Sequence, residues 1–182
     1  LRATKKVKRG LGSVRQDLNI SIKQGALVEI KGVQELELVS QVVEYEVQRQ
    51  LSLLGIRDEL RQRNVKDSNL KKDFVDVTSI LAESKSKVVH SALKHGGVAY
   101  AVCLHGFKGL LKRELVPGVR LGTEMAKRAA FWGKVGGIVH SDELPAYGIE
   151  SNHVDLIAQK LGCKELDAFV VIADQKENAF DG

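Results

Sequence analysis

The chain has 182 residues, enough for one large or two small domains, with a hydrophobic content of 43% and a net charge of +5. It contains no apolar run of bilayer-spanning length and no secretory signal pattern, which argues against a membrane protein or a secreted one. The two cysteines, Cys103 and Cys163, form no CxxC motif and are too few for a disulfide framework, which favours a reducing cytoplasm.

The amino-terminal third is predicted to form a β-hairpin followed by a long helix. Residues 14–22 are rich in β-branched and polar residues, and Gly25 separates them from a second short strand at residues 26–30. Across residues 36–54 apolar side chains recur at three- and four-residue spacing, which predicts a helix. Gly55 is placed like a C-terminal cap or a kink, with a helical continuation beyond it.

A polar run without periodicity, residues 64–73, is interpreted as a linker between two domains, residues 1–63 and 74–182. The second domain alternates helical and extended segments, and this order predicts an α+β fold in which it is a two-layer α/β sandwich. Its predicted elements are a helix ending at residues 95–97, a strand at 98–104, a helix at 123–131 capped by Thr123, a strand at 135–139, a helix at 151–161 capped by Ser151 and ended by Gly162, a strand at 168–173, and a final helix capped by Asp174.

Basic residues gather in two acid-free runs. Residues 1–15 and residues 84–113 each carry six Lys or Arg and no acid, whereas nine acids face three bases from Asp142 onward. Such separation is typical of a protein that binds a polyanion in one orientation, and an unevenly charged, solvated surface is the alternative. The basic residues of the second run are Lys85, Lys87, Lys94, Lys108, Lys112 and Arg113.

The predicted hairpin carries polar residues at two-residue spacing. Asp17 and Asn19 project to one face of the first strand, and Glu29 and Lys31 project to one face of the second. If the strands pair, one face gathers two carboxylates, an amide and an ammonium, which suit Mg²⁺ and phosphate. A solvent-exposed face with a cross-strand salt bridge is the alternative, and spacing alone favours it.

Two further polar groupings are candidates for a catalytic or metal site. One is His140, Asp142 and Glu143, and the other is Cys103 with His105. Zinc requires four converging ligands, and the two cysteines lie far apart in the sequence, so a structural role is favoured for both groupings. Four aromatic residues near glycines could stack on unpaired bases, although packing beneath a loop is favoured. They are Phe107, Phe131, Trp132 and Tyr147.

Two blocks of the sequence resemble a known family. Residues 131–149 hold the only Trp, one of two Pro residues and a Gly pair before Ile138, and end an apolar run in His-Ser-Asp-Glu. This block resembles the insertion domain found in the E subunit of archaeal glutamyl-tRNA(Gln) amidotransferase and in bacterial aspartyl-tRNA synthetases. Residues 12–22, 28–34 and 44–50 resemble the catalytic cradle that the B and E subunits of amidotransferases share. A synthetase would carry class II aminoacylation motifs before the insertion domain, and this sequence has none there. The two blocks follow one another in the order expected of the E subunit.

The resemblance implies an ATP- and Mg²⁺-dependent ligase. In this family the cradle phosphorylates the γ-carboxylate of glutamate mischarged on tRNA(Gln), and ammonia then displaces phosphate to leave glutamine. By this resemblance Glu29, Asp17 and Lys31 are catalytic, with Glu29 and Asp17 as metal ligands. Asn19 and Arg15 would bind the cofactor. The six basic residues of the second run would contact the tRNA backbone.

The resemblance also implies partners. An asparaginase-like D subunit supplies ammonia, tRNA(Gln) carrying glutamate is the substrate, and the assembly is a cytoplasmic heterotetramer without membrane contact. The family's first cradle motif and its helical tail are absent and the chain opens on Leu1, so we expect a fragment that is inactive alone. The alternative is a non-catalytic tRNA-docking module. The sequence contains no motif that would indicate a third class, an unrelated metal-dependent hydrolase.

Overall fold

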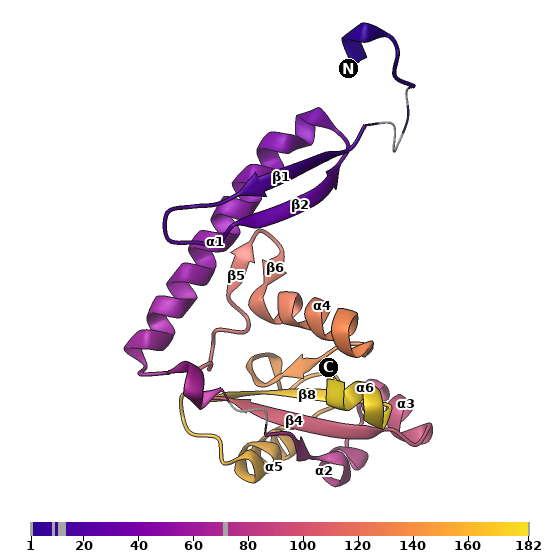
Figure 1. Ribbon diagram of the computed structural model, residues 1–182. Helices are drawn as coiled ribbons and strands as arrows, with labels where there is room; N and C mark the ends of the chain where they lie inside the picture. The colour runs from indigo at the N-terminus through magenta and orange to yellow at the C-terminus, as the bar shows by residue number, and fades with distance from the viewer. Residues whose placement is uncertain (1, 9, 11–13, 71–72, 182) are drawn as a thin grey trace. The chain divides into compact units, whose positions relative to one another are not determined.

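The computed structural model describes residues 2–8, 10, 14–70 and 73–181 (Figure 1). The chain divides into two compact units, Leu1–Arg57 and Asp58–Gly182, called here the hairpin unit and the sheet unit. Within the described part of the chain, no helix combines the length and apolar character that crossing a membrane requires.

The hairpin unit contains the two predicted strands and most of the long helix. Strand β1 (Gln16–Ile20) pairs antiparallel with β2 (Val28–Val33), placing Ile20 opposite Val28, and the pairing is interrupted by a bulge. Short 3₁₀ helices η1 (Arg2–Thr4) and η2 (Leu36–Leu38) precede β1 and α1 (Val39–Gln62). Helix α1 runs through Gly55 without a break, so neither a cap nor an end forms there. Burial of the next residue, Ile56, favours the helix over the local propensity cost of glycine, about 1 kcal/mol.

The turn of the hairpin packs closely on α1. A Cβ atom added at Gly25 would lie 2.0 Å from the Oε1 atom of Gln50, so only glycine fits there without movement of Gln50. Gln50 in turn donates a 2.9 Å hydrogen bond to Glu46, and Arg49 donates a 3.1 Å bond to the same carboxylate. The hairpin therefore rests on a buried polar stretch of the helix.

The sheet unit is built on a four-stranded antiparallel sheet. The strand order is β3-β4-β8-β7, and β4 and β8 pair over their full length, from Val98 opposite Asp174 to Leu104 opposite Ala168. Its strands are β3 (Val75–Asp76), β4 (Val98–Leu104), β7 (Val139–His140) and β8 (Ala168–Asp174), with a separate hairpin of β5 (Glu114–Val116) and β6 (Val119–Arg120). Its helices are α2 (Thr78–Ala82), α3 (Lys87–Lys94), α4 (Leu121–Gly133), α5 (Ser151–Leu161) and α6 (Lys176–Asp181), with 3₁₀ turns η3 (Asp67–Asn69) and η4 (Ser141–Glu143).

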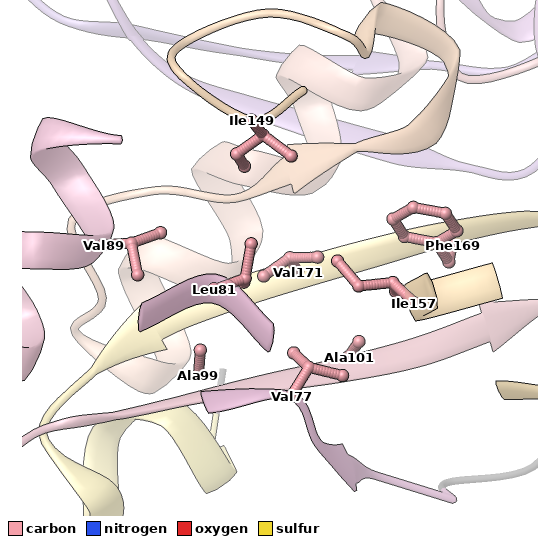
Figure 2. Packing of buried hydrophobic residues seen from close by; sticks show 9 residues of the cluster. All are labelled: Val77, Leu81, Val89, Ala99, Ala101, Ile149, Ile157, Phe169 and Val171. Carbon is pink, nitrogen blue, oxygen red and sulfur yellow. The ribbon is translucent and has the colours of Figure 1, made fainter. Parts of the chain in front are cut away.

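Helices cover both faces of this sheet. On one face Leu81 of α2, Val89 of α3 and Ile157 of α5 pack against Phe169 and Val171 of β8 (Figure 2). Burying a side chain of this size contributes about 1.5 to 3 kcal/mol. On the other face Ala129 of α4 and Ala179 of α6 pack against Ile172. Figure 1 shows α4 on the side of the sheet opposite α2 and α5. The predicted α+β class is confirmed, and α4 and α6 add a third layer to the expected two-layer sandwich.

Most predicted elements of the sheet unit form, with shifted ends. Strand 98–104 and helix 151–161 are confirmed, and Gly162 ends α5 with a φ of 67°. The caps differ: α4 begins at Leu121 rather than at Thr123, and the N-cap of α5 is Glu150 rather than Ser151. Asp174 does accept hydrogen bonds at the start of α6, from the Gln175 backbone and the Asn178 side chain. Strand β7 keeps only Val139 of the expected residues 135–139 and adds His140, because the chain bends at Gly136 before it becomes extended.

The boundary between the units lies earlier than the predicted linker at residues 64–73. The last turn of α1 belongs to the sheet unit. Arg63 donates hydrogen bonds to the carbonyl oxygens of Gly106 and Lys108, and Val65 lies against Gly106. These contacts tie the end of the helix and the start of the predicted linker to the sheet unit. Lys71 and Lys72, which belong to that linker, lie outside the described residues.

Candidate functional site

The hairpin brings the predicted catalytic residues onto one exposed face. Asn19 lies directly opposite Glu29 in the register of β1 and β2. Asp17 and Lys31 are exposed at the next outward positions, while Leu18 and Ile30 between them are half-buried. The predicted gathering of two carboxylates, an amide and an ammonium is therefore present in the structure.

Part of this face has a structural task. The Oδ1 atom of Asp17 accepts a 3.0 Å hydrogen bond from the backbone N–H of Gly32, which sits in the bulge at a φ of +80°. Arg15 lies 4.0 Å from the same oxygen, and Lys31 forms a 3.2 Å ion pair with Glu29. Asp17 therefore stabilises the bulge, and Glu29 is paired along its own strand.

The donor set fits a magnesium–nucleotide complex in its chemistry. Mg²⁺ is usually held by one or two carboxylates while phosphates and water complete its octahedron, and Asp17 and Glu29 supply that number. Lys31 and Arg15 supply cations suited to phosphate oxygens. Among the described residues, however, the hairpin face is not a group of three or more close metal-ligating side chains. Its residues fit as one wall of a site.

A second polar cluster in the hairpin unit was not predicted as a site. Glu46 and Gln50 are buried, at 6% and 5% exposure, with Arg49 bonded to Glu46. The Oε1 atom of Gln50 is buried and finds no hydrogen-bond partner within the described part of the chain. The block 44–50 carried part of the family resemblance, and within it only Glu46 and Gln50 are buried, with Gln50 close to the hairpin turn at Gly25. Apolar periodicity did not reveal this buried polar pair.

The basic residues of the second run divide into two groups. Lys85, Lys87 and Lys94 flank or belong to α3, while the others follow β4. Lys94 and Lys108 lie beyond opposite ends of β4, a seven-residue strand about 23 Å long. The six residues therefore do not form one compact patch.

Two of these six cations have acidic partners. Lys85 forms a 2.8 Å ion pair with Glu150, and Arg113 forms a 2.5 Å ion pair with Glu59. Hydrogen bonding to Arg113 is the largest cause that holds the pKa of Glu59 below its ordinary value. Among the described residues the remaining four, Lys87, Lys94, Lys108 and Lys112, have no carboxylate partner and are exposed.

The His-Ser-Asp-Glu segment has a structural role, as expected. The carboxylate of Asp142 accepts hydrogen bonds from the backbone of Gly109 at 2.8 Å and of Leu111 at 2.9 Å. His140 is 7% exposed and lies close against Gly122 of α4. Asp142 thereby fixes the loop that carries Lys108 and Lys112.

The aromatic residues correct one expectation. Packing beneath a loop is observed for Phe107, which joins the apolar cluster around Leu111. Phe131, Trp132 and Tyr147 are instead 76%, 74% and 61% exposed. Helix α4 turns Phe131 and Trp132 outward, because Leu121, Met125 and Ala129 take its inward positions.

The structure also corrects the argument against a metal site at Cys103 and His105. That argument rested on the sequence separation of the two cysteines. The chain reversal between β4 and β8 removes the separation, since Cys103 and Cys163 lie with their Sγ atoms 3.2 Å apart. The sequence signal was a pair of short spacings, Cys-x-His and Cys-x₃-Asp, in two segments that the sheet brings together.

Each part of the chain matches a known protein family. The GatB/GatE catalytic domain family matches residues 1–108, and the GAD domain family matches residues 89–181. The E subunit of glutamyl-tRNA(Gln) amidotransferase from Thermococcus gammatolerans is 55% identical over 179 residues, which cover 98% of this chain and 28% of that protein. The same subunit from Methanococcus maripaludis strain C5 is 49% identical over 176 residues, covering 97% and 27%.

The E subunit from Pyrococcus abyssi is 54% identical over 179 residues. The similarity thus extends along nearly all of this chain, but the chain spans only 28% of the length of that relative. The expected order, part of a cradle and then the insertion domain, agrees with the order of the two family matches. The chain belongs to the family formed by the E subunits of archaeal glutamyl-tRNA(Gln) amidotransferases.

Proposed function

We propose that this chain contributes one wall of an ATP–Mg²⁺ site and a tRNA-docking unit to a glutamyl-tRNA(Gln) amidotransferase. The observation that carries the proposal is the register of the hairpin, which sets Asn19 opposite Glu29 on the exposed face that also holds Asp17 and Lys31. The names of the relatives support the substrate, glutamate attached to tRNA(Gln).

The proposed reaction has two steps. The γ-phosphoryl group of ATP passes to the γ-carboxylate of glutamate on tRNA(Gln), and ammonia then displaces inorganic phosphate to leave the amide of glutamine. Bound Mg²⁺ would offset the charge of the phosphate oxygens. Glu29 and Asp17 would hold that ion, Lys31 and Arg15 would bind phosphate oxygens, and Asn19 would orient the nucleotide.

The proposal extends to the assembly. Ammonia would come from an asparaginase-like D subunit in a cytoplasmic heterotetramer, and the exposed lysines of the sheet unit would contact the tRNA backbone. The 182 residues alone would not complete the reaction, because one wall of a site cannot enclose ATP. Incubation of the chain with mischarged tRNA, ATP, Mg²⁺ and ammonium should yield no glutaminyl-tRNA above background.

Substitution of Glu29 in the full-length protein, with its ammonia-supplying partner, tests the catalytic assignment. Glu29→Gln removes one charge and keeps the shape, so glutamate activation should fall by about 100-fold or more, a loss of several kcal/mol, while tRNA affinity stays within about 2-fold. Glu37→Gln is the matched control, since Glu37 is exposed in η2 and lies outside the blocks that resemble the cradle. Equal losses of activation and tRNA affinity, or no loss of either, would refute the role.

A non-catalytic docking module is the second candidate. It is favoured by the partners that Asp17 and Glu29 already have within the hairpin. Isothermal titration of the chain with ATP–Mg²⁺ separates the two, because a cradle wall retains measurable affinity that falls in Glu29→Gln. A docking module binds tRNA and gives no heat with the nucleotide.

A further inference from the structure

Four potential metal ligands lie at one end of β4, and the ligand atoms of three of them, Cys103, His105 and Asp167, are all within 4.8 Å of one another. Cys103 and His105 come from the end of this strand and the residue after it, while Cys163 and Asp167 come from the segment between α5 and β8. The two pairs are about sixty residues apart in the chain, with Cys103 and Cys163 separated by 60 positions. All four belong to the sheet unit.

The distances among Cys103, His105 and Asp167 are close to the edges of a tetrahedron around zinc. Zinc–ligand bonds of about 2.3 Å to sulfur and about 2.0 to 2.2 Å to nitrogen or oxygen imply edges of about 3.8 Å for S···S, about 3.6 Å for S···N and about 3.4 Å for N···O. The Sγ atoms of Cys103 and Cys163 are 3.2 Å apart. Cys103 Sγ lies 3.7 Å from His105 Nδ1, which lies 3.0 Å from Asp167 Oδ2. Cys163 lies beside Cys103 but outside the group in which the ligand atoms of Cys103, His105 and Asp167 are all within 4.8 Å of one another, so its side chain would have to move inward to complete the tetrahedron.

The surroundings of Asp167 suit a ligand. Its side chain is only 6% exposed, and its Oδ1 atom accepts a 2.9 Å hydrogen bond from the backbone of Gly106. Its Oδ2 atom accepts a 2.9 Å bond from the backbone of Lys164 and faces His105. Backbone donors of this kind orient a metal-binding carboxylate. His105 is 41% exposed and lines an open hollow, so a cation has a route from solvent.

We propose that Cys103, His105, Cys163 and Asp167 form a binding site for a borderline-soft divalent cation, with Zn²⁺ as the best match. Two thiolates, one imidazole and one carboxylate make a four-coordinate structural site. Binding releases two protons from the thiols, and the imidazole proton moves from Nδ1 to Nε2 so that Nδ1 can coordinate. The ion would fasten the end of β4 to the α5–β8 connection.

A disulfide between Cys103 and Cys163 is the competing outcome. It would require an S–S distance of about 2.05 Å and would leave the convergence of His105 and Asp167 unexplained. The metal uses all four side chains, so the observations favour it.

Cobalt titration of the reduced, metal-free chain tests the proposal. A tetrahedral thiolate site should give one equivalent of bound Co²⁺, with thiolate-to-cobalt charge-transfer bands and intense visible bands that Zn²⁺ abolishes. The chain has only two cysteines, so the charge-transfer bands report on Cys103 and Cys163 alone.

Single variants identify the ligands. Cys163→Ser, His105→Gln and Asp167→Asn should each weaken Zn²⁺ affinity by at least about 100-fold, since loss of a direct ligand exceeds the about 10- to 100-fold effect of an outer partner. His90→Gln, at an exposed histidine of α3, is the matched control and should bind normally. The wild-type titration remains decisive if a variant fails to fold. Absence of thiolate–cobalt bands from the fully reduced chain would overturn the proposal, and a Cys103–Cys163 disulfide found by intact mass would then explain the pair.

Discussion

The carboxylate of Glu59 accepts a 2.5 Å hydrogen bond from Arg113, which lies 54 residues further along the chain. Its other oxygen accepts a 2.5 Å bond from Arg63. Glu59 is thus shared by two arginines and joins the last turn of α1 to the loop before β5. Arg113, which the sequence analysis predicts to contact tRNA, therefore also has a structural role within the fold.

Because of this ion pair, the free energy of unfolding should decrease as the pH falls in the acid range. The folded state holds the pKa of Glu59 below its ordinary value of 4.5, mainly through Arg113. Because the pKa of Glu59 is lower in the folded state, the stabilisation is fully present above the ordinary value and is lost as the pH falls through the folded pKa. Glu59→Gln should therefore cost about 1 to 2 kcal/mol near neutral pH and much less near pH 3. Urea unfolding at both pH values measures the difference.

An exposed acid provides the control. Glu83→Gln should change the unfolding free energy little at either pH, because Glu83 is exposed. If the cost of Glu59→Gln were the same at both pH values, the charge of Glu59 would not be the source of its stabilisation.

The unit boundary gives a second prediction. A chain of residues 58–182 keeps the bonds of Glu59 to Arg113 and of Arg63 to Gly106, whereas residues 74–182 lack both. The longer piece should melt several degrees higher, since a loss of 1 kcal/mol lowers the melting temperature of such a domain by about 4 °C. Equal melting temperatures in scanning calorimetry would place the boundary after residue 73.

Local sequence patterns correctly predicted several helices and strands of the structure. The spacing of apolar residues in α1 and the apolar run of β4 are properties of neighbouring residues, so both could be found from sequence. Ends and caps depend on tertiary contacts. Helix α4 begins before Thr123 because Gly122 must pack beneath His140, a residue that no local rule connects with it.

Contacts could not be predicted where the two residues are distant in sequence. Asp17, Asn19, Glu29 and Lys31 share a face because a short hairpin fixes their register, and this was foreseeable. The approach of Cys103 to Cys163 depends on the pairing of β4 with β8, which sequence spacing does not reveal. The outward direction of Trp132 likewise depends on which face of α4 meets the sheet.

A third prediction concerns two glycines with nearly equal backbone angles. Gly148 has a φ of +81° and Gly118 a φ of +78°. A Cβ at Gly148 would lie 2.4 Å from the backbone of Lys85, whereas nothing lies within 4 Å of a Cβ at Gly118. Gly118→Ala should cost about 1 to 2 kcal/mol from the left-handed conformation alone. Gly148→Ala should cost about 2 to 5 kcal/mol, because the clash adds to the strain.

Chemical unfolding of the two alanine variants isolates the steric contribution. The difference between their unfolding free energies reports the contact between Gly148 and Lys85, since the conformational cost is common to both. Similar losses in the two variants would mean that the segment moves away from Lys85 at little cost.

The fourth prediction concerns binding of tRNA by the exposed loop after β4. Lys108 and Lys112 are exposed, and Asp142 holds the backbone between them through Gly109 and Leu111. Their side chains can therefore be removed without loss of the loop. The double variant Lys108→Ala, Lys112→Ala should bind several tRNAs more weakly and to a similar degree, because phosphate contacts carry no sequence information.

Salt dependence distinguishes phosphate contacts from a solvated surface. Each lost contact should flatten the slope of log affinity against log salt by about 0.7 to 0.9, so the double variant should lose roughly one to two units of slope. Lys160→Ala with Lys176→Ala, in the acid-rich part of the chain, is the matched control and should leave the slope unchanged. If the Lys108 and Lys112 variant also keeps the wild-type slope, this loop is only a solvated surface. The phosphate contacts would then be sought in the other acid-free run, at Lys5, Lys6, Lys8 and Arg9, of which Arg9 lies outside the described residues.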